Sequence, residues 1–483
     1  MFIACFANII SKHTSNSFYN RMDGYMYTVD FQKPVWIHFI GIGGISMSGL
    51  AEILLEKGFK ITGSDLRRTP VTEHLESLGV QIVYEQKADN IQPGTDLIVY
   101  TAAVHADNPE YAAALASGIP VMDRAALLGQ IMSHYANSIA VSGTHGKTTT
   151  TSMLSHIFIA AEKDPTVTVG GVLKGIHGNI RLGHSDNFIA EACEYTNSFL
   201  KFDPHIELIL NIDADHLDFF KDLDDIRHSF RLFAEKLGEE DILVINGEIP
   251  RYEEITEGLP CKVITFGMNA SSDYTASAVE FDEDGNPVFD VICRGSRLCR
   301  AHLRIPGVHN IFNALAAIAV ADELGISMEA VQDGLDHFTG TDRRFERKGF
   351  VGGVEIIDDY AHHPTEIAAT LEAAKRYPHR SIWCVFQPHT YSRTLALKKD
   401  FAKALSAADH VVLAKIYPAR EEDPGTISSG EIRALLEEMG CDAYYFDTFE
   451  AIEKFLLKKC VHGDLLITMG AGNVVNIGED LLK

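Results

Sequence analysis

Short apolar runs separated by helix-like stretches recur through the first third of the chain. Val35–Ile40, Lys60–Asp65 and Leu97–Tyr100 each have the length and apolar content of a buried strand. A stretch with helical periodicity runs through Leu55, and a shorter apolar run at Ile119–Val121 continues the alternation. Because strands that alternate with helices are typical of parallel sheets, we predict a parallel-sheet domain here.

The same alternation predicts further sheets in the rest of the chain. Strands are expected from Ser138 and from Val354, and over Phe188–Glu194, Glu207–Ile212, Ser381–Phe386, Val411–Leu413 and Leu465–Thr468. An alanine-rich helix is predicted over Ala314–Leu324, and Phe338–Glu346 is a polar, charged linker. The strands after this linker are predicted to form a second, smaller α/β sheet.

The length of the chain sets the expected number of domains. At about 150 residues per domain, 483 residues indicate about three domains. We predict boundaries at 31–135, 136–339 and 340–483, with the first domain ending near His134.

The first 30 residues differ from the rest. Phe2–Ile10 is a short apolar patch that lacks both a preceding basic residue and a small-residue cleavage pattern, so it does not fit a secretory signal. We predict that residues 1–30 are either a disordered extension or the result of an upstream start, with Met22 or Met26 as the true beginning.

Composition limits the class of protein. The formal net charge of −25 argues against nucleic-acid and anionic-membrane surfaces, and no apolar run approaches 18 residues. The eight cysteines include no C-x-x-C pair, so neither a disulfide framework nor a cysteine zinc site is indicated. We therefore expect a cytoplasmic protein without a membrane or nucleic-acid partner.

The strand from Ser138 runs into a glycine turn that is typical of phosphate binding. Gly143 and Gly146 permit close backbone approach, and the following amides lie at a helix N-terminus that favours anions. Lys147 can reach the β and γ phosphates, and the Thr148 hydroxyl can bind Mg²⁺. The full G-x-x-x-x-G-K-[ST] pattern has Gly where this chain has Val141, so a tight turn without a ligand is the alternative.

A second glycine loop follows the first strand of the chain. Gly41, Gly43 and Gly44 resemble the first turn of a dinucleotide-binding fold, and Asp65 stands where such folds hold a ribose. The spacing departs from G-x-G-x-x-G. A structural glycine turn with Asp65 as a cap is therefore the alternative.

Acidic and imidazole groups follow two central strands. In an open parallel sheet, ligands lie beyond the carboxyl ends of the strands, so Glu191 and His216 can converge on a metal held by Thr148. The alternative for His216 is a loop imidazole that caps the next helix. Asp215 and Asp218 are interpreted as helix-capping, solvated acids.

Further polar groups are candidates for nucleotide and substrate contacts. Asn310 and Asn313 lie one helical turn apart and can share a face toward a base, although such residues often only cap. Arg343 and Arg344 offer planar donors suited to phosphate transfer, or form a solvated turn. Polar clusters also follow the strands from Val354 and Ser381, and they include Tyr360, His362, Gln387, His389, Ser392 and Arg393.

Taken together, these motifs resemble the Mur ligases from about Val35 to the end of the chain. The matching segments are Gly41–Ala51, Gly143–Thr149, Ala214–Asp218, His309–Asn313, Arg343–Glu346, Asp358–Pro364 and Gly470–Asn473. The resemblance implies an α/β fold with an N-terminal Rossmann-like parallel sheet, a central P-loop ATPase-like domain and a smaller C-terminal Rossmann-like domain.

The resemblance also implies roles for individual residues. The UDP part of the substrate would contact Gly41, Gly43, Gly44, Ser64 and Asp65; ATP would contact Gly143, Thr144, His145, Gly146, Lys147, Thr148, Thr149, His309, Asn310, Asn313 and Arg343. Mg²⁺ would be held by Thr148, Glu191 and His216, with Glu194 a weaker second carboxylate. Tyr360, His362 and Arg393 would face the substrate, and Lys147, His362 and Arg344 would be catalytic.

The implied activity is an ATP-dependent ligase of peptidoglycan precursor synthesis that joins L-alanine to the lactyl carboxylate of UDP-N-acetylmuramate through an acyl phosphate. The lack of Lys between Lys221 and Lys236 resembles the alanine-adding branch. Alternatives are a murein-recycling peptide ligase, a folate-type glutamate ligase, a nicotinamide dehydrogenase and a non-catalytic nucleotide sensor. We expect a monomer or weak dimer with small-molecule substrates.

Overall fold

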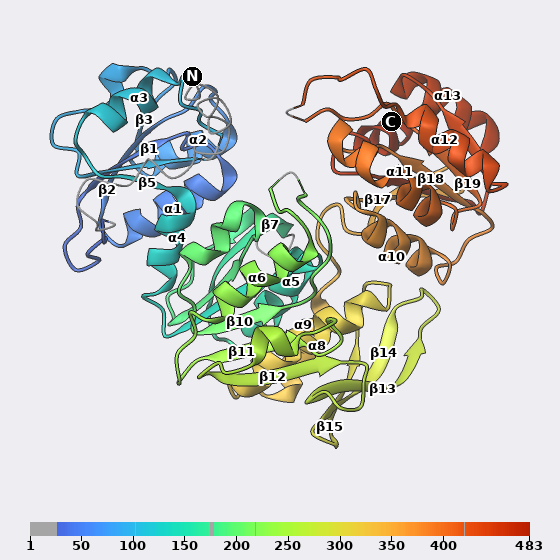
Figure 1. Cartoon of the computed structure of the whole chain (residues 1–483), viewed down its shortest axis with the longest axis horizontal. Helices are drawn as coiled ribbons and strands as arrows, with labels where there is room; N and C mark the ends of the chain where they lie inside the picture. Colours follow the sequence, from blue (N-terminus) through green and yellow to red (C-terminus); the bar gives the residue numbers. More distant parts are fainter. Residues whose placement is uncertain (1–26, 102, 174–177, 218, 420) are drawn as a thin grey trace, which may run out of the picture. The chain divides into compact units, whose positions relative to one another are not determined.

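A computed structural model describes residues 27–101, 103–173, 178–217, 219–419 and 421–483 of the chain. The predictions for residues 1–26, including Met22 and Met26 as starts, and for Asp218 lie outside these residues. The chain divides into two compact units at Gln130/Ile131. Figure 1 labels their helices and strands. The predicted disorder does not extend to Val29, which is buried in the first unit and whose amide donates to the Gln130 side chain at 2.8 Å.

The first unit contains the predicted parallel sheet. Its five strands lie in the order β3-β2-β1-β4-β5 and are all parallel: β1 (Trp36–Ile40), β2 (Lys60–Ser64), β3 (Gln81–Val83), β4 (Leu97–Tyr100) and β5 (Val121–Asp123). The connecting helices are α1 (Ile45–Glu56), α2 (Pro70–Ser77), η1 (Ala88–Asn90), α3 (Pro109–Ala116) and α4 (Arg124–Met132), which crosses the division between the units. The predicted run at Ile119–Val121 overlaps the last strand only at Val121, where β5 begins.

The second unit begins with a ten-stranded sheet in the order β15-β14-β13-β12-β11-β10-β6-β9-β7-β8. Its strands are β6 (Asn137–Ser142), β7 (Thr166–Leu173), β8 (Gly178–Arg181), β9 (Asn187–Glu191), β10 (Ile206–Ile209), β11 (Ile242–Asn246), β12 (Lys262–Gly267), β13 (Tyr274–Phe281), β14 (Pro287–Cys293) and β15 (Ser296–His302). Because β6 pairs in parallel with both β9 and β10, the polar ends of these strands meet at one edge, as predicted.

Antiparallel strands extend this sheet on both sides. The pairs β13·β14, β14·β15 and β7·β8 are antiparallel, whereas the strands from β12 through β10 and β6 to β7 are parallel. We did not predict the β13–β15 extension. Buried residues alternate with partly exposed ones along β14 and in the first half of β13, which indicates that one face of this extension is more solvated than the other.

A six-stranded sheet in the order β16-β17-β21-β18-β19-β20 forms the last part of the second unit. Its strands are β16 (Glu346–Val351), β17 (Val354–Asp359), β18 (Ile382–Phe386), β19 (His410–Leu413), β20 (Asp442–Tyr445) and β21 (Leu465–Met469), and β16 alone among them pairs antiparallel. The smaller α/β sheet predicted after the linker is therefore confirmed.

Helices join the strands of the second unit and pack on its sheets. They are α5 (Lys147–Ala160), η3 (Tyr195–Lys201), α6 (Leu223–Ala234), α7 (Glu253–Thr256), α8 (His309–Glu323), α9 (Met328–His337), α10 (Pro364–Ala374), α11 (Tyr391–Leu405), α12 (Ser429–Glu438), α13 (Phe449–Lys459) and α14 (Val475–Leu481). The core of the ten-stranded sheet includes α5 and α8, and α5 packs against both α8 and α9. Among the described residues, no helix has both the length and the apolar character of a membrane span.

The carboxyl group of Glu207 is buried within this unit. Glu207 of β10 is 0% exposed, and neither of its side-chain oxygens has a hydrogen-bond partner among the described residues. Burial raises the pKa of Glu207 well above its ordinary value, because an apolar surrounding disfavours the charged form.

Candidate active site

The phosphate loop joins β6 to α5 through a left-handed glycine. Gly146 is the N-cap of α5 with φ +86°, and a Cβ atom there would lie 2.5 Å from Asn313 Oδ1. Asn211, just beyond β10, holds the loop from the other side: its Oδ1 accepts from the His145 amide at 2.8 Å, and its Nδ2 donates to the His145 carbonyl at 2.9 Å. Both features keep the amides of α5 open to an anion.

Lys147 folds back onto this loop. Its ammonium group donates to the carbonyls of Gly143 and Thr144 and pairs with Glu194, with 2.9 Å from Nζ to Oε2. Burial opposes the charged form, but Glu194 and neighbouring acids outweigh this and raise the pKa of Lys147. The lysine is therefore charged at the position where a phosphate would lie.

The predicted metal ligands fall into two groups of contacting residues. Glu191, at the end of β9, accepts from the Gly170 amide at 2.7 Å and from the Thr148 side chain. His216 Nε2 lies 3.9 Å from Glu194 Oε1, and its ring packs on Tyr195 with centroids 4.5 Å apart. The structure thus brings Thr148 to Glu191, and His216 to Glu194. His216 does not cap α6, because Asp222 fills that position.

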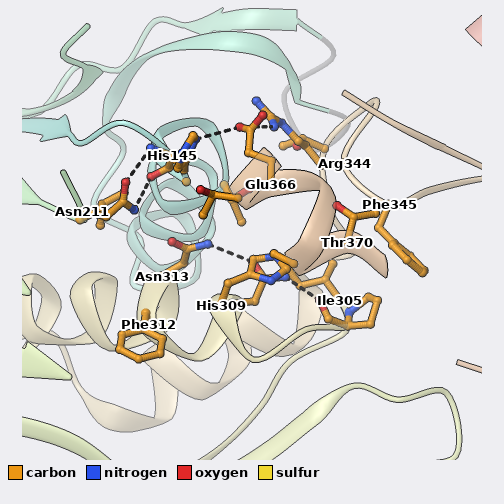
Figure 2. Close-up of a pocket in the computed structure, with 18 of the residues that line it drawn as sticks. His145, Asn211, Ile305, His309, Phe312, Asn313, Arg344, Phe345, Glu366 and Thr370 are labelled. Carbon is orange, nitrogen blue, oxygen red and sulfur yellow. Dashed lines mark hydrogen bonds and ion pairs between the residues drawn. The ribbon is translucent and has the colours of Figure 1, made fainter. Parts of the chain in front are cut away.

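A cavity of about 380 Å³ opens beside the phosphate loop (Figure 2). Of the predicted ATP contacts, its lining includes His145, Gly146, Thr149, His309, Asn310 and Asn313. Gly143, Thr144, Lys147, Thr148 and Arg343 are not among the lining residues. Arg344 does line it, together with residues of α10. The cavity lies within the usual size range of small-molecule sites, with convergent polar groups on an apolar wall.

Asn310 and Asn313 share the cavity wall and bond to each other. Asn313 Nδ2 donates to Asn310 Oδ1 at 3.0 Å, and Asn310 Nδ2 donates to the Pro306 carbonyl at 2.7 Å. The helix starts at His309, earlier than the predicted Ala314, so both residues lie inside α8 and neither is its N-cap. His309, the first residue of α8, is exposed and lines the same cavity beside them.

A carboxylate that we did not predict connects the phosphate loop with α10. Glu366 Oε1 lies 3.2 Å from His145 Nδ1 and 3.7 Å from Arg344 Nη1 (Figure 2). Glu366 Oε2 lies 3.3 Å from His362 Nδ1. On its other nitrogen, His145 lies 3.3 Å from Asp213. Burial disfavours charge here, but the two carboxylates outweigh it and raise the pKa of His145 to about 9.

Arg343 and Arg344 have different partners. Arg343 donates to Asp358 at 2.8 Å and to the carbonyls of Gly470 and Gly472, so it ties the linker to the last loop of the six-stranded sheet. Arg344 reaches the cavity. Both guanidinium groups lie over the Tyr360 ring, at 4.9 and 5.2 Å from its centroid, and this contact restricts their orientation.

The prediction for Asp215 was wrong. Asp215 is 8% exposed and pairs with Arg393 Nη2 at 2.8 Å, so it is not a solvated helix cap. Burial raises its pKa, but the Arg393 charge outweighs burial and lowers the pKa of Asp215 to about 2. Arg393 is thereby held near His362, whose pKa burial lowers to about 4. A neutral imidazole is the form that can accept a proton.

The glycine loop of the first unit is closed by Asp65. Gly43 donates to Asp65 Oδ2 at 2.9 Å, and the amides of Gly41 and Ile42 both donate to the Ser64 carbonyl at 2.9 Å. A Cβ atom on Gly43 would lie 2.8 Å from the same carboxylate oxygen. Asp65 thus acts as the loop cap that we considered as the alternative. Contact with a nucleotide sugar stays a prediction.

Sequence reasoning missed Asn211, Asp213 and Glu366. Glu366 stands three residues after His363, the N-cap of α10, and closes a capping box with it. A polar residue followed three positions later by Glu, with Pro between them, was a local signal for this arrangement. Asn211 and Asp213 bond to the phosphate loop from more than 60 residues away, so spacing carried no comparable signal.

Comparison with known protein families covers three segments of the chain. Residues 36–136 match the Mur ligase family catalytic domain, residues 141–321 match the Mur ligase middle domain, and residues 343–472 match the Mur ligase glutamate ligase domain.

Individual relatives span almost the whole chain. The UDP-N-acetylmuramate–L-alanine ligase of Agathobacter rectalis is 60% identical over 95% of this chain and 100% of its own length. The structure of UDP-N-acetylmuramate-alanine ligase from Thermotoga maritima is 31% identical, with a TM-score of 0.75 over 93% of this chain and 98% of that one. A murein peptide ligase from Psychrobacter arcticus is 25% identical, with a TM-score of 0.66 over the same shares of the two chains.

Proposed function

The chain belongs to the Mur ligase family, and from that premise we propose that it joins L-alanine to the lactyl carboxylate of UDP-N-acetylmuramate at the expense of ATP. The observation that carries this proposal is the 60% identity to the relative named for that reaction, over 95% of the chain. The product would be a precursor of peptidoglycan.

We propose the central cavity and the phosphate loop as the ATP site. The amides at the start of α5 and the charged Lys147 would bind the phosphates, once the lysine leaves Glu194. Asn310, Asn313 and His309, which line the cavity, would contact the base. Arg344, which lines the same cavity, would stabilise the transferring phosphoryl group.

The donor set beside the loop fits Mg²⁺. Thr148 and Glu191 offer hydroxyl and carboxylate oxygens that already touch, and hard oxygen ligands are those that Mg²⁺ prefers. His216 would lie on the far side of Glu194. When bound, Mg²⁺ supplies charge neutralisation to the phosphates.

The proposed chemistry runs through an acyl phosphate. The lactyl carboxylate attacks the γ-phosphorus of ATP, and ADP leaves. The neutral amine of alanine then attacks the acyl carbon, the C–O bond to phosphate breaks, and the amine loses a proton. His362 is neutral and positioned between Tyr360 and Glu366, so it can accept that proton, while Arg393 would face the alanine carboxylate.

A competition assay tests the proposed activity against the related ligases. Phosphate release from ATP is measured with Mg²⁺ and UDP-N-acetylmuramate, and with L-alanine, a murein tripeptide or glutamate supplied singly. We expect release with L-alanine at least tenfold faster than with the other two. Faster release with the tripeptide would replace the proposal by the recycling reaction, and no release with any of them would end it.

The proposed chemistry also bears on the cellular location and the oligomeric state of the protein. All three substrates are soluble small molecules, and ATP and nucleotide sugars are cytoplasmic compounds, so we propose a cytoplasmic enzyme that acts as a monomer or weak dimer. Sedimentation velocity of the purified full chain tests the assembly state.

A further inference from the structure

Three metal-ligating side chains from separate segments meet at the edge of the central cavity. His145 lies in the phosphate loop, Asp213 follows β10, and His363 immediately precedes α10. Their donor atoms all lie within 4.8 Å of one another. We propose that they form a binding site for a divalent transition-metal ion of the zinc class, separate from the proposed magnesium ligands.

The spacing of the donors matches such an ion. His145 Nε2 lies 3.3 Å from Asp213 Oδ2, and His363 Nδ1 lies 3.7 Å from the same oxygen. Two ligand atoms bound to one tetrahedral zinc ion at about 2.0–2.1 Å are about 3.3–3.4 Å apart. Two of the three donor pairs are thus close to this spacing, the third pair lies within 4.8 Å, and a fourth position is left for water or a ligand.

The outer nitrogen of each imidazole already has an acceptor. His145 Nδ1 lies 3.2 Å from Glu366 Oε1, and His363 Nε2 lies 3.3 Å from the Ala214 carbonyl oxygen. Histidines that bind a metal usually donate their second N–H to a carboxylate or a carbonyl, which fixes tautomer and ring orientation. His363 donates its Nε2 proton to the Ala214 carbonyl and so keeps the lone pair of Nδ1 on the side of Asp213. His145 is protonated between Glu366 and Asp213, so a bound metal ion would replace the proton on its Nε2.

The carboxylate ligand is held in the same way. Asp213 Oδ1 accepts from the Ala214 amide at 2.8 Å, and Oδ2 accepts from the Thr365 hydroxyl at 2.5 Å. The Thr365 amide also approaches His363 Nδ1 at 3.4 Å, a long N-cap contact that a metal would replace. The site is thus nearly formed before any ion enters.

The donor types select the class of ion. Imidazole nitrogen suits zinc, cobalt, nickel and copper, whereas Mg²⁺ prefers an all-oxygen set. Because His145 and Asp213 line the cavity and His363 belongs to the start of α10, a bound ion would fix the phosphate loop to that helix. Short-range spacing in the sequence could not indicate this site, because His145 and Asp213 are 68 residues apart.

Cobalt titration of the full chain tests the proposal without nucleotide or substrate. Four-coordinate Co²⁺ bound to nitrogen and oxygen absorbs visible light, and we expect such a band to saturate at one equivalent and to disappear when Zn²⁺ is added. His145→Gln, Asp213→Asn and His363→Gln should each weaken binding at least 100-fold. Glu366→Gln should weaken it about 10- to 100-fold, because it changes only the group that orients His145.

Matched variants separate this site from others. Thr148→Ala and Glu191→Gln alter the proposed magnesium ligands and should leave the cobalt band unchanged, while circular dichroism verifies that each variant is folded. Absence of a band in excess Co²⁺, persistence of the band in folded Asp213→Asn, or its loss after thiol alkylation would overturn the proposal. Since binding is read without turnover, the result is independent of the proposed ligase activity.

Discussion

Lys147 and Glu194 form an ion pair at the start of α5, with Nζ 2.9 Å from Oε2 and the Glu194 side chain only 2% exposed. The same lysine also donates to two carbonyls of its own loop. A triphosphate would have to replace these partners. Without nucleotide, the negative charge of Glu194 therefore balances the positive charge of the Lys147 ammonium group. This pairing lowers the free-energy cost of burying that charge.

Lys147→Ala should lower kcat of phosphate release by about 10² or more, the scale of losing one donor that stabilises the transferring charge. Lys163→Ala, an exposed lysine just beyond the other end of α5, is the control and should stay near wild type. Steady-state phosphate release with all three substrates measures both. Wild-type turnover in Lys147→Ala would remove this residue from the mechanism.

Gly146→Ala should lower kcat/KM for ATP by at least about tenfold, because the new Cβ would meet Asn313 Oδ1 at 2.5 Å and the residue has φ +86°. Gly258→Ala is matched for backbone strain alone: its φ is +71° and nothing lies within 4 Å of the added atom. Initial rates at varied ATP concentration give kcat/KM for both variants. The comparison separates the effect of the clash with Asn313 from the effect of placing alanine at a positive φ. Equal rates in the two variants would contradict the packing argument.

Arg393→Ala should destabilise the protein by about 3–5 kcal/mol, since it leaves Asp215 buried without its cation. Arg433→Ala removes an arginine from a surface pair with 3.6 Å from Nε to Glu437 Oε1, and should cost less than about 1 kcal/mol. Urea denaturation measures both. Adding Asp215→Asn to Arg393→Ala should restore part of the loss; no recovery would mean that the arginine acts through packing.

Glu207→Met should stabilise the protein by about 1–3 kcal/mol, because it removes a buried carboxyl without a hydrogen-bond partner. The pKa of Glu207 is higher in the folded state, so below the ordinary carboxyl pKa both states are protonated and ionisation costs nothing. As the pH rises, only the unfolded state loses the proton, and the native protein loses stability until the raised pKa is passed. The gain should therefore be larger at about pH 8 than at about pH 5.

Thermal unfolding of Glu207→Met at both pH values checks this, with Glu239→Met at an exposed position as the control. A gain that is independent of pH would show that Glu207 is not protonated in the native protein.

Local patterns predicted the parallel strands and the phosphate loop well. The strand at Leu97–Tyr100 has the predicted bounds, and the end of β9 at Glu191 lies at the predicted sheet edge. A buried strand follows from the apolar residues within it, and a glycine turn follows from its own glycines, so both can be predicted from a single segment of the sequence. The start of α8 was placed too late because the polar His309 and Asn310 interrupt the alanine pattern.

Long-range contacts were not predictable in this way. Asp215 has the sequence context of a solvated loop acid, and only Arg393, 178 residues later, makes it a buried ion pair. Glu207 occupies one polar position in an apolar strand, and nothing in that strand shows that the Glu207 side chain is fully buried in the fold. The roles of the site residues in binding and catalysis stay predictions until they are tested.

The bonds of Arg343 to the carbonyls of Gly470 and Gly472 have a consequence for how the protein matures. Arg344, the next residue, reaches the cavity, yet the anchor of this linker lies 127 residues further along the chain. The loop after β21 must therefore fold onto the linker before Arg344 is held in place, and disrupting that loop should lower turnover more than it lowers nucleotide binding.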